Sequence, residues 1–221
     1  GVIDGFPPGF RIDFEKVKSF MARRAPGRNL TTPRKEADEP RILSGLADDD
    51  VTCGAPLSFL IENTNTRSKD YSQLRDVPRP MHSDYPAAIK YGGHNDIRGG
   101  GHFSGRLTAP ICFAGAVALQ LLEARGIVIG SHIASVGSVR DERFNPMTVD
   151  ADLLRHLATL DLPAMDPSAA AQMRTLIEDV RANQDSVGGT IEAAAVGVPA
   201  GLGDPLFDKL DSLIARLLFS I

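Results

Sequence analysis

The sequence predicts a mixed, layered fold in which helices pack against β-sheets. Three observations lead to this class. Several segments repeat apolar residues at helical spacing, short apolar runs typical of strands alternate with them, and proline- or glycine-rich stretches separate the two kinds. The 221 residues are 43% hydrophobic and 24% charged, which is ordinary for a soluble globular protein with a substantial core.

The first part of the chain predicts a strand, a helix and a pair of strands. Residues 1–5 favour a strand that ends in a proline–glycine turn. Asp13 precedes an amphipathic segment that ends in Arg23 and Arg24, so we expect a helix capped by Asp13 and suited to its dipole. A polar, proline-rich loop follows, and residues 41–63 predict two strands around an aspartate-rich turn.

The second half of the chain alternates helices and strands. The expected elements are helices at 108–126, 150–162, 167–184 and 205–221 and strands at 127–139 and 186–203. Ser168 is the expected N-cap of the helix at 167–184. His132 falls within an apolar strand and His156 on an amphipathic helix, so we expect both to be structural.

Residues 64–106 show no regular periodicity. A stretch of this length without regular structure is usually functional or disordered. Aromatic and aliphatic side chains are spread through it, which argues against disorder. We therefore expect an irregular but ordered site-forming segment, within a single domain that spans residues 1–221.

Composition excludes several classes of partner. The net charge of -4 gives no general preference for nucleic acid or an acidic membrane surface. No apolar stretch is expected to approach the length of a membrane span, and the first residues do not resemble a signal peptide. Cys53 and Cys112 lack metal-type spacing, so we expect two buried thiols in a reducing cytosol.

Arginines gather in and around the irregular segment. Arg24 and Arg28 flank a proline–glycine turn, while Arg79, Arg98 and Arg106 lie near histidines and glycines. Guanidinium forks bind phosphate and carboxylate oxygens bidentately, so converging arginines indicate a small ligand with several negative charges. A set of solvated surface arginines is the plain alternative.

The glycine run in "RGGGHFS", Arg98 to Ser104, suits an anion. Successive glycines let backbone N–H groups approach a ligand closely, and the helix expected from Thr108 would add its positive end. A flexible loop without a ligand is the alternative, because glycine runs commonly serve as loops.

Histidines and aspartates alternate in the same segment. The histidines are His82, His94 and His102. Imidazoles titrate near neutral pH and suit acid–base chemistry. The pairs His82/Asp84 and His94/Asp96 also have a spacing that could ligate a metal, so a metal-dependent phosphohydrolase is an alternative function.

Several blocks together resemble the chorismate synthase family. The blocks are "RSKDY" at 67–71, "RPMHSDY" at 79–85, "KYGG" at 90–93, "RGGGHFSGRLTAP" at 98–110, "DSVGG" at 185–189 and "GVPAGLGDPLFDKLD" at 197–211. They occur in the family's order over essentially the whole chain. Their number and length make chance a poor explanation.

The resemblance implies a fold and an activity. The fold is α+β, a layered β-α-β sandwich of the chorismate synthase type, and it would be incomplete at both ends, because the family's G-x-S-H-G segment and its C-terminal region are missing here. The activity is the 1,4-anti elimination of phosphate from 5-enolpyruvylshikimate 3-phosphate, which gives chorismate in the shikimate pathway toward aromatic amino acids. The family uses reduced FMN although the reaction has no net redox change.

The resemblance also implies residue roles. His82 matches the family's proton donor to the reduced flavin. Arg24, Arg79 and Arg106 match arginines that bind the substrate, and Arg28 is expected to replace a second loop arginine of the family. The residues at the place of the family's flavin-contacting motif are His102, Phe103 and Ser104.

The family further implies a cytoplasmic homotetramer supplied by an external flavin reductant. Some members reduce flavin with NADPH, but we expect this chain to have no appended flavin-reductase domain, which favours the external source. No metal, nucleic acid or membrane is expected as a partner. Because the end segments are missing, a non-catalytic, truncated anion-binding protein is a further alternative.

Overall fold

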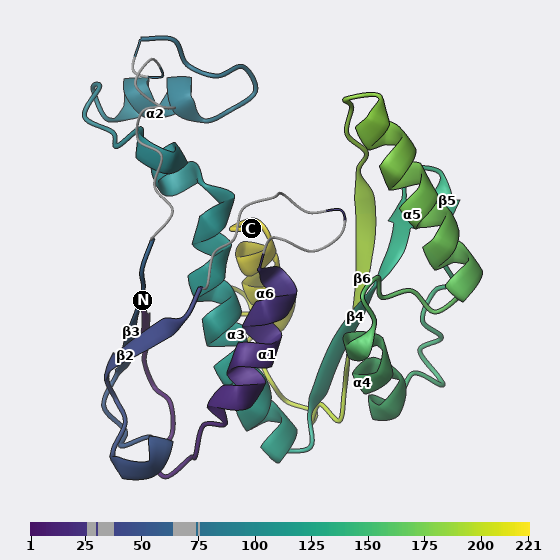
Figure 1. The fold of residues 1–221 in the computed structure, drawn as a ribbon. Helices are drawn as coiled ribbons and strands as arrows, with labels where there is room; N and C mark the ends of the chain where they lie inside the picture. Colours follow the sequence, from purple (N-terminus) through teal and green to yellow (C-terminus); the bar gives the residue numbers. More distant parts are fainter. Residues whose placement is uncertain (26–29, 31–37, 64–73, 75) are drawn as a thin grey trace. The chain divides into compact units, whose positions relative to one another are not determined.

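A computed structural model describes residues 1–25, 30, 38–63, 74 and 76–221 of the chain. The chain forms two compact units. Unit 1 comprises residues 1–117 and 206–221, and unit 2 comprises residues 118–205. The α+β class expected from the sequence is confirmed by the helices and sheets of both units (Figure 1). The single domain expected for 1–221 stays a prediction.

Unit 1 contains a three-stranded antiparallel sheet. The strands are β1 (Val2–Ile3), β2 (Pro40–Ser44) and β3 (Leu57–Ile61), in the order β1-β3-β2. The connection between β2 and β3 carries a short 3-10 turn at Asp48–Asp50. The predicted pair of strands around an aspartate-rich turn is therefore confirmed, and β3 is the central strand.

Two helices of unit 1 follow the sequence pattern. α1 (Phe14–Arg24) begins after Asp13, whose carboxylate accepts hydrogen bonds from the backbone N–H groups of Glu15 and Lys16. The predicted cap is thus confirmed, and it satisfies donors that the first turn of a helix leaves free. α3 (Thr108–Ala124) is the apolar helix expected after the glycine run, and its residues 108–117 belong to unit 1.

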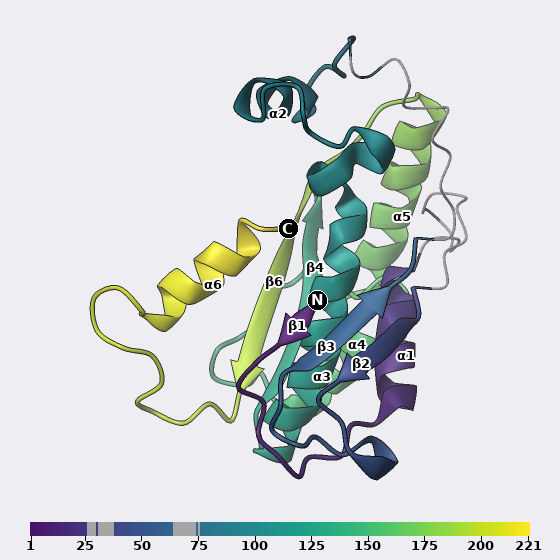
Figure 2. The same cartoon turned by 90° about the vertical axis from the view of Figure 1, so that its left-hand side faces the viewer.

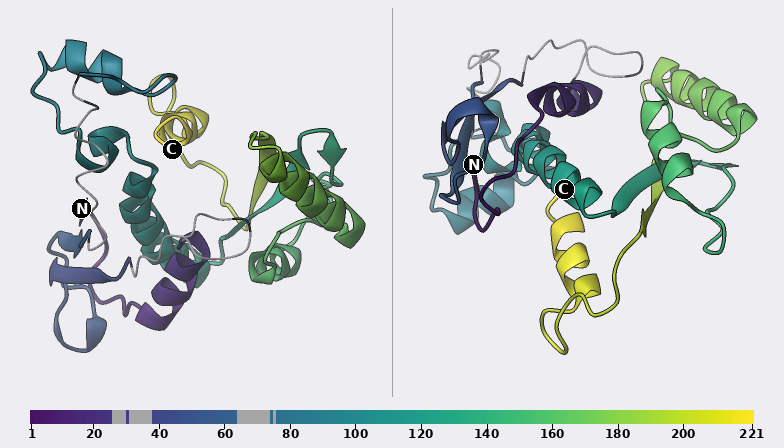
Figure 3. Two further views of the ribbon diagram at one scale, coloured as in Figure 1. Left: turned by 45° about the horizontal axis from the view of Figure 1, so that its top comes forward. Right: turned by 90° about the horizontal axis from the view of Figure 1, so that it is seen from below.

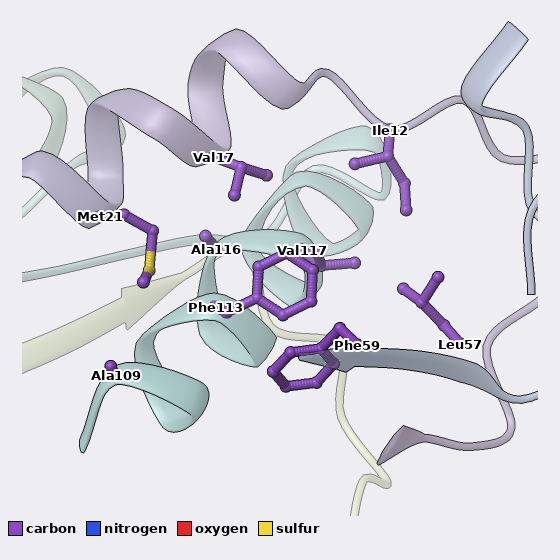
Figure 4. Packing of buried hydrophobic residues seen from close by; sticks show 9 residues of the cluster. All are labelled: Ile12, Val17, Met21, Leu57, Phe59, Ala109, Phe113, Ala116 and Val117. Carbon is purple, nitrogen blue, oxygen red and sulfur yellow. The ribbon is translucent and has the colours of Figure 1, made fainter. Parts of the chain in front are cut away.

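The core of unit 1 forms between α1, α3 and β3. Phe113 of α3 is fully buried, and its ring centroid lies 4.3 Å from that of Phe59 on β3. Figure 4 shows Phe113 between Phe59 and the α1 side chains Val17 and Met21. The other buried members of this cluster are Ile12, Leu57, Ala109, Ala116 and Val117. The apolar face of α1 and the start of α3 are therefore held by one shared core.

The stretch expected to be irregular contains short regular elements. Its described part includes α2 (Asp84–Lys90) and 3-10 turns at Arg98–Phe103 and Gly105–Leu107. The expectation of no regular structure is wrong for these residues. Elements this short repeat no apolar pattern long enough to be recognised, so periodicity could not reveal them.

Unit 2 is a sheet with two helices packed on it (Figures 1 and 2). The strands are β4 (Val128–Val136), β5 (Val139–Arg140) and β6 (Gly189–Val196), all antiparallel, with β4 in the middle (Figure 3). The helices are α4 (Ala151–Thr159) and α5 (Pro167–Ala182). Each packs a different group of residues against β4, and the buried residues are Val128, Phe144, Leu154 and Leu157 for α4 and Val136, Ala169 and Met173 for α5.

The cap of α5 differs from the expectation. Asp166, not Ser168, is the N-cap, and its carboxylate accepts a hydrogen bond from the Ser168 N–H at 2.8 Å. Pro167 then occupies the first helical position, where its missing N–H has no intrahelical partner to lose. The helix therefore begins two residues earlier than a Ser168 cap would allow.

A polar cluster around a buried histidine lies inside unit 2. His132 on β4 is fully buried, with Nδ1 2.8 Å from Oδ2 of Asp141 and Nε2 3.0 Å from Oε2 of Glu192 on β6. The ring of Phe144 packs edge-on against the imidazole. The structural role expected for His132 agrees with this position, whereas His156 is exposed on α4.

The last helix, α6 (Leu210–Leu218), is shorter than the helix expected at 205–221. No residue of α6 is buried, although its sequence is amphipathic. Leu213, Ile214 and Leu217 are all exposed on it.

Among the described residues, one helical stretch, Gly105–Ala124, is long and apolar enough to cross a membrane by length and composition. The expectation that no apolar stretch approaches this length is therefore wrong. Buried core helices pass the same criterion, and Phe113 and Val117 of this stretch are fully buried in unit 1.

The two cysteines also depart from the expectation. Both are free thiols, but Cys53 is exposed and Cys112 only partly buried. The prediction of two buried thiols is therefore wrong for Cys53. Burial raises the pKa of the Cys112 thiol, which keeps it protonated at neutral pH.

Candidate functional site

Arg24 and Arg106 meet at one carboxylate. Arg24 ends α1 and Arg106 lies in the 3-10 turn before α3, yet both guanidiniums form ion pairs with Asp38. Nη1 of Arg106 lies 2.9 Å from Oδ1 of Asp38, and Nη1 of Arg24 contacts Oδ2. The side chain of Asp38 is 1% exposed and each arginine side chain 19%. Two of the arginines predicted to bind substrate are thus brought together.

Arg24 has further fixed partners near the start of α3. Its Nε donates to Oγ1 of Thr108 at 3.2 Å, and its Nη2 donates to the Gly105 carbonyl at 3.4 Å. Thr108 itself donates to the same carbonyl at 2.6 Å. The side chain of Arg24 therefore ties the end of α1 to the turn that carries Arg106.

Burial and the neighbouring Arg24 guanidinium lower the pKa of Arg106. Both causes oppose the charged form: one withdraws the guanidinium from water, and the other places a second cation beside it. An arginine still keeps its proton near neutral pH. The pair is therefore a concentrated positive centre whose repulsion an anion relieves.

Arg106 also faces a cavity of about 290 Å³ in unit 1. This volume lies near the lower end of the range for small-molecule sites. Arg98, Gly101 and Ser104 from the glycine-rich turn share the wall, and Phe59 and Leu107 supply apolar surface. Guanidinium groups, a hydroxyl and bare backbone therefore line the same space.

The glycine run forms a 3-10 turn at Arg98–Phe103. Gly101 adopts a φ of 54°, and a Cβ at this residue would lie 2.2 Å from the carbonyl oxygen of Asp96. Only glycine fits such a contact without a backbone shift. Gly101 lines the cavity, so its close packing sets the position of that wall.

A second cluster of candidate residues surrounds the start of α2. Asp84 is 7% exposed and accepts hydrogen bonds from Nε of Arg79 at 2.8 Å and from Nη2 at 3.0 Å. Nδ1 of His82 lies 2.7 Å from Oδ1 of the same carboxylate. Nη2 of Arg79 lies 3.2 Å from both ring nitrogens of His82. His82 and Arg79 therefore share Asp84.

The hydrogen bond from Arg79 holds the pKa of Asp84 well below its usual range, against the raising effect of burial. The carboxylate is consequently charged at any pH near neutrality. A charged acceptor beside Nδ1 favours the tautomer with the proton on that nitrogen.

The remaining predicted residues lie in different surroundings. His102 and Phe103 are exposed on the glycine-rich turn, with Phe103 41% exposed. Ser104 caps the following turn, where its Oγ accepts a hydrogen bond from the Arg106 N–H at 3.2 Å. Arg28 lies outside the described residues.

The two clusters stay separate in the described part of the chain. Arg79 and His82 do not line the cavity that Arg106 faces. Sequence reasoning placed all the arginines around one ligand, whereas the structure describes an arginine pair on Asp38 and an arginine–histidine pair on Asp84.

The sequence of this chain matches the model of the family described as chorismate synthase over residues 1–221. The chain belongs to the chorismate synthase family.

Individual chorismate synthases agree with this assignment. A protein named chorismate synthase from Bacteroides thetaiotaomicron is 42% identical over 222 residues, which cover 100% of this chain and 60% of that protein. One of the same name from Lancefieldella parvula is 40% identical over 229 residues, covering 99% of this chain and 60% of that protein. A crystal structure of chorismate synthase matches with a TM-score of 0.68 at 25% identity, covering 100% of this chain and 60% of that chain.

This chain therefore spans about 60% of the length of the chorismate synthases that it matches. The fold expected from the resemblance, of the chorismate synthase type, is confirmed by the structural match.

The alternative of a metal-dependent phosphohydrolase is not supported. Asp84 accepts a hydrogen bond from Nε of Arg79. Asp96 accepts hydrogen bonds from Nε and Nη2 of Arg98 at 2.9 and 2.8 Å. These hydrogen bonds lower the pKa of Asp96 to about 2. No group of three potential metal ligands occurs among the described residues. The two H-x-D pairs are therefore built around arginines.

Sequence reasoning missed Asp38 as a site residue. Its partner Arg24 is 14 residues away, and Arg106 follows much later in the chain. No local pattern links an aspartate in a polar loop to two arginines from other segments. The one available signal was an acidic residue within a segment rich in candidate anion-binding arginines.

Proposed function

We propose that the protein containing this chain is a chorismate synthase that eliminates phosphate from 5-enolpyruvylshikimate 3-phosphate to give chorismate. The observation that carries this proposal is the family match over every residue of the chain, together with the meeting of Arg24 and Arg106 beside a cavity. A substrate with a phosphate and two carboxylates needs such a positive centre.

In this reaction Arg106 contacts an anionic group of the substrate directly from the cavity wall. Arg24 supports it from behind, because its guanidinium is tied to Thr108, Gly105 and Asp38. Positive charge near the leaving phosphate stabilises the negative charge that develops as the C–O bond breaks. Arg79 contributes through His82 and Asp84, to which its guanidinium is bound.

His82 is the proposed proton donor to the reduced flavin. Asp84 fixes its ring through Nδ1, so Nε2 donates or accepts a proton at the ligand. The imidazole is about one quarter exposed, with a side-chain value of 26%, and is therefore open to an exchange partner.

Reduced FMN is the proposed cofactor. Phe103 presents an exposed aromatic ring and His102 an exposed imidazole on the glycine-rich turn, and both fit contact with a planar, polar-edged group. Ser104 adds a hydroxyl at the cavity wall. When bound, reduced FMN supplies the electron-rich partner that the family's elimination requires without net redox change.

The proposal extends to the surroundings of the enzyme. We place it in the cytoplasm as a homotetramer whose flavin is reduced by an external system, with NADPH as a source of electrons. The supporting argument is family membership.

The test is turnover by the full-length protein. Purified protein is mixed anaerobically with 5-enolpyruvylshikimate 3-phosphate and chemically reduced FMN, and chorismate and phosphate are quantified. Stoichiometric release of both products is expected. Substrate binding without either product would contradict the proposal and favour a non-catalytic anion-binding protein. An Asp161→Asn variant serves as a matched control, because this carboxylate pairs with Arg174 in unit 2.

A further inference from the structure

The carboxylate of Asp38 lies in surroundings that are unusual for a charged group. The residue is 3% exposed, and burying a charge is unfavourable unless opposite charges compensate it. Its backbone has a φ of 46°, in the left-handed region that non-glycine residues seldom adopt. A residue that combines a buried charge with this backbone is held in place by its surroundings.

Those surroundings are the two guanidiniums. Arg24 contacts Oδ2, and Nη1 of Arg106 lies 2.9 Å from Oδ1. Within the described part of the chain, Oδ1 accepts no aligned hydrogen bond. Asp38 therefore attracts Arg106 by charge, while Arg24 is held by directional bonds.

The three charges sum to one positive charge. Two guanidiniums beside each other repel, and both are too buried for solvent to screen that repulsion fully. A carboxylate between them removes most of the repulsion. It also leaves Arg106 on the cavity wall with an excess of positive charge behind it.

We propose that Asp38 is a positioning residue: its carboxylate holds Arg24 and Arg106 side by side, so that Arg106 meets an anionic group of the substrate without prior rearrangement. This inference rests on the proposed function, because it assigns the arginine pair to the substrate. Asp38 touches the arginines and acts through them. Preorganisation of this kind improves affinity by reducing the ordering that binding requires.

The charge-neutral variant Asp38→Asn tests this role in the full-length protein. We expect KM for 5-enolpyruvylshikimate 3-phosphate to rise about tenfold to a hundredfold, the range for losing an interaction with a charged group. The value of kcat should change less than KM, because Arg24 and Arg106 keep their charges in this variant and lose only the group that orders them before binding. An unchanged or lower KM would overturn the proposal.

A double-mutant cycle separates positioning from a general structural role. Arg24→Gln and Arg24→Gln/Asp38→Asn are measured beside the single variants. If Asp38 acts through the pair, its removal should cause little further weakening once Arg24 is gone. An equal rise in KM in both backgrounds would show independent action and contradict the proposal.

If Asp38→Asn folds poorly, the double variant still tests the proposal. It removes one positive and one negative charge together, so the net charge of the cluster stays at one positive charge. Its KM is compared directly with that of Arg24→Gln. The exposed pair of Asp161 with Arg174 provides the control, and Asp161→Asn should retain the wild-type KM.

The cycle can also be read out by a binding measurement that needs no turnover. Inorganic phosphate, titrated by calorimetry, reports anion binding by the same four proteins. A wild-type protein that produces no chorismate would count against the proposed function. Phosphate affinities that fail to show the expected coupling of Asp38 with Arg24 would count against the positioning role.

Discussion

Oδ1 of Asp84 lies 2.7 Å from Nδ1 of His82, at the first turn of α2. The same carboxylate binds the guanidinium of Arg79 through two nitrogens. Asp84 therefore orients an imidazole and an arginine at once, and neither of these side chains can be changed without affecting the other.

Replacing His82 tests its role as a proton carrier. In the full-length enzyme, His82→Ala should reduce kcat by about two to four orders of magnitude, the usual contribution of a general acid or base. The melting temperature should stay close to that of the wild type, because the ring is partly exposed. His156→Ala, on the exposed face of α4, is the matched control. Near wild-type kcat for His82→Ala would contradict the assignment.

Asp84→Asn should lower kcat by a smaller amount, about tenfold to a thousandfold, because the imidazole remains but loses its charged partner. In a His82→Ala background the same change should have little further effect on kcat. Steady-state kinetics of the four proteins measure this coupling. Equal effects in both backgrounds would show that Asp84 acts only on the structure of α2.

Gly101→Ala should distort the cavity wall. The added Cβ would meet the Asp96 carbonyl oxygen at 2.2 Å, and φ is 54°. A strained backbone of this kind costs about 1–3 kcal/mol of folding free energy. Urea denaturation measures this loss, and the affinity for FMN should fall as well. Gly105→Ala, with no atom within 4 Å of its Cβ, should lose much less stability.

The core of unit 1 should depend strongly on Phe113. This ring is fully buried, and Phe113→Ala should reduce the free energy of unfolding by about 3–5 kcal/mol through lost burial and a cavity. Ile111 lies on the same helix but is 42% exposed, so Ile111→Ala should cost far less. Urea denaturation of both variants gives the comparison. Equal losses would mean that this packing is not what stabilises the unit.

The buried cluster around His132 should make unit 2 sensitive to acid. Burial raises the pKa of Asp141, but hydrogen bonds from the Met165 and Asp166 N–H groups and from His132 outweigh it, and the net shift is downward. The pKa of Glu192 is also lowered, and the hydrogen bond from His132 is the largest cause. Carboxylates with lowered folded-state pKa values stabilise the protein above their unfolded values of about 4.

That contribution should be complete at neutral pH and disappear as the pH falls from about 4 through the folded-state values. The melting temperature is measured from pH 7 to pH 3. Asp141→Asn should lower it at pH 7 and flatten its dependence on pH. Asp152, whose side chain is 93% exposed, is the control, and Asp152→Asn should leave the profile unchanged. A steep profile that persists in Asp141→Asn would place the sensitivity elsewhere.

Local patterns predicted much of the fold. The cap at Asp13 and the apolar face that follows it are contained in a few neighbouring residues, and α1 forms there. α2 was missed because only seven residues form it, and two of them, Asp84 and Ala87, are buried by tertiary contacts. The cap of α5 moved by two residues because Asp166 and Ser168 are both good caps, and Pro167 decides between them.

The candidate site was predictable in composition but not in arrangement. Arginine, histidine and glycine types predicted an anionic ligand, and three residues of that pattern, Arg106, Ser104 and Gly101, line one cavity. Which acid binds which arginine depends on contacts between distant segments. Asp38 and Asp84 could therefore be identified as the partners of these arginines only from the fold.

The core around Phe113 also has a consequence for synthesis on the ribosome. α1 leaves the ribosome before α3, so its apolar face meets its partners in α3 only after a further part of the chain has been made. At about 5–20 residues per second, the nascent chain waits several seconds with Val17 and Met21 uncovered. Chaperones that bind apolar segments have that interval in which to act, whereas unit 2, built from one continuous stretch, can close as soon as it emerges.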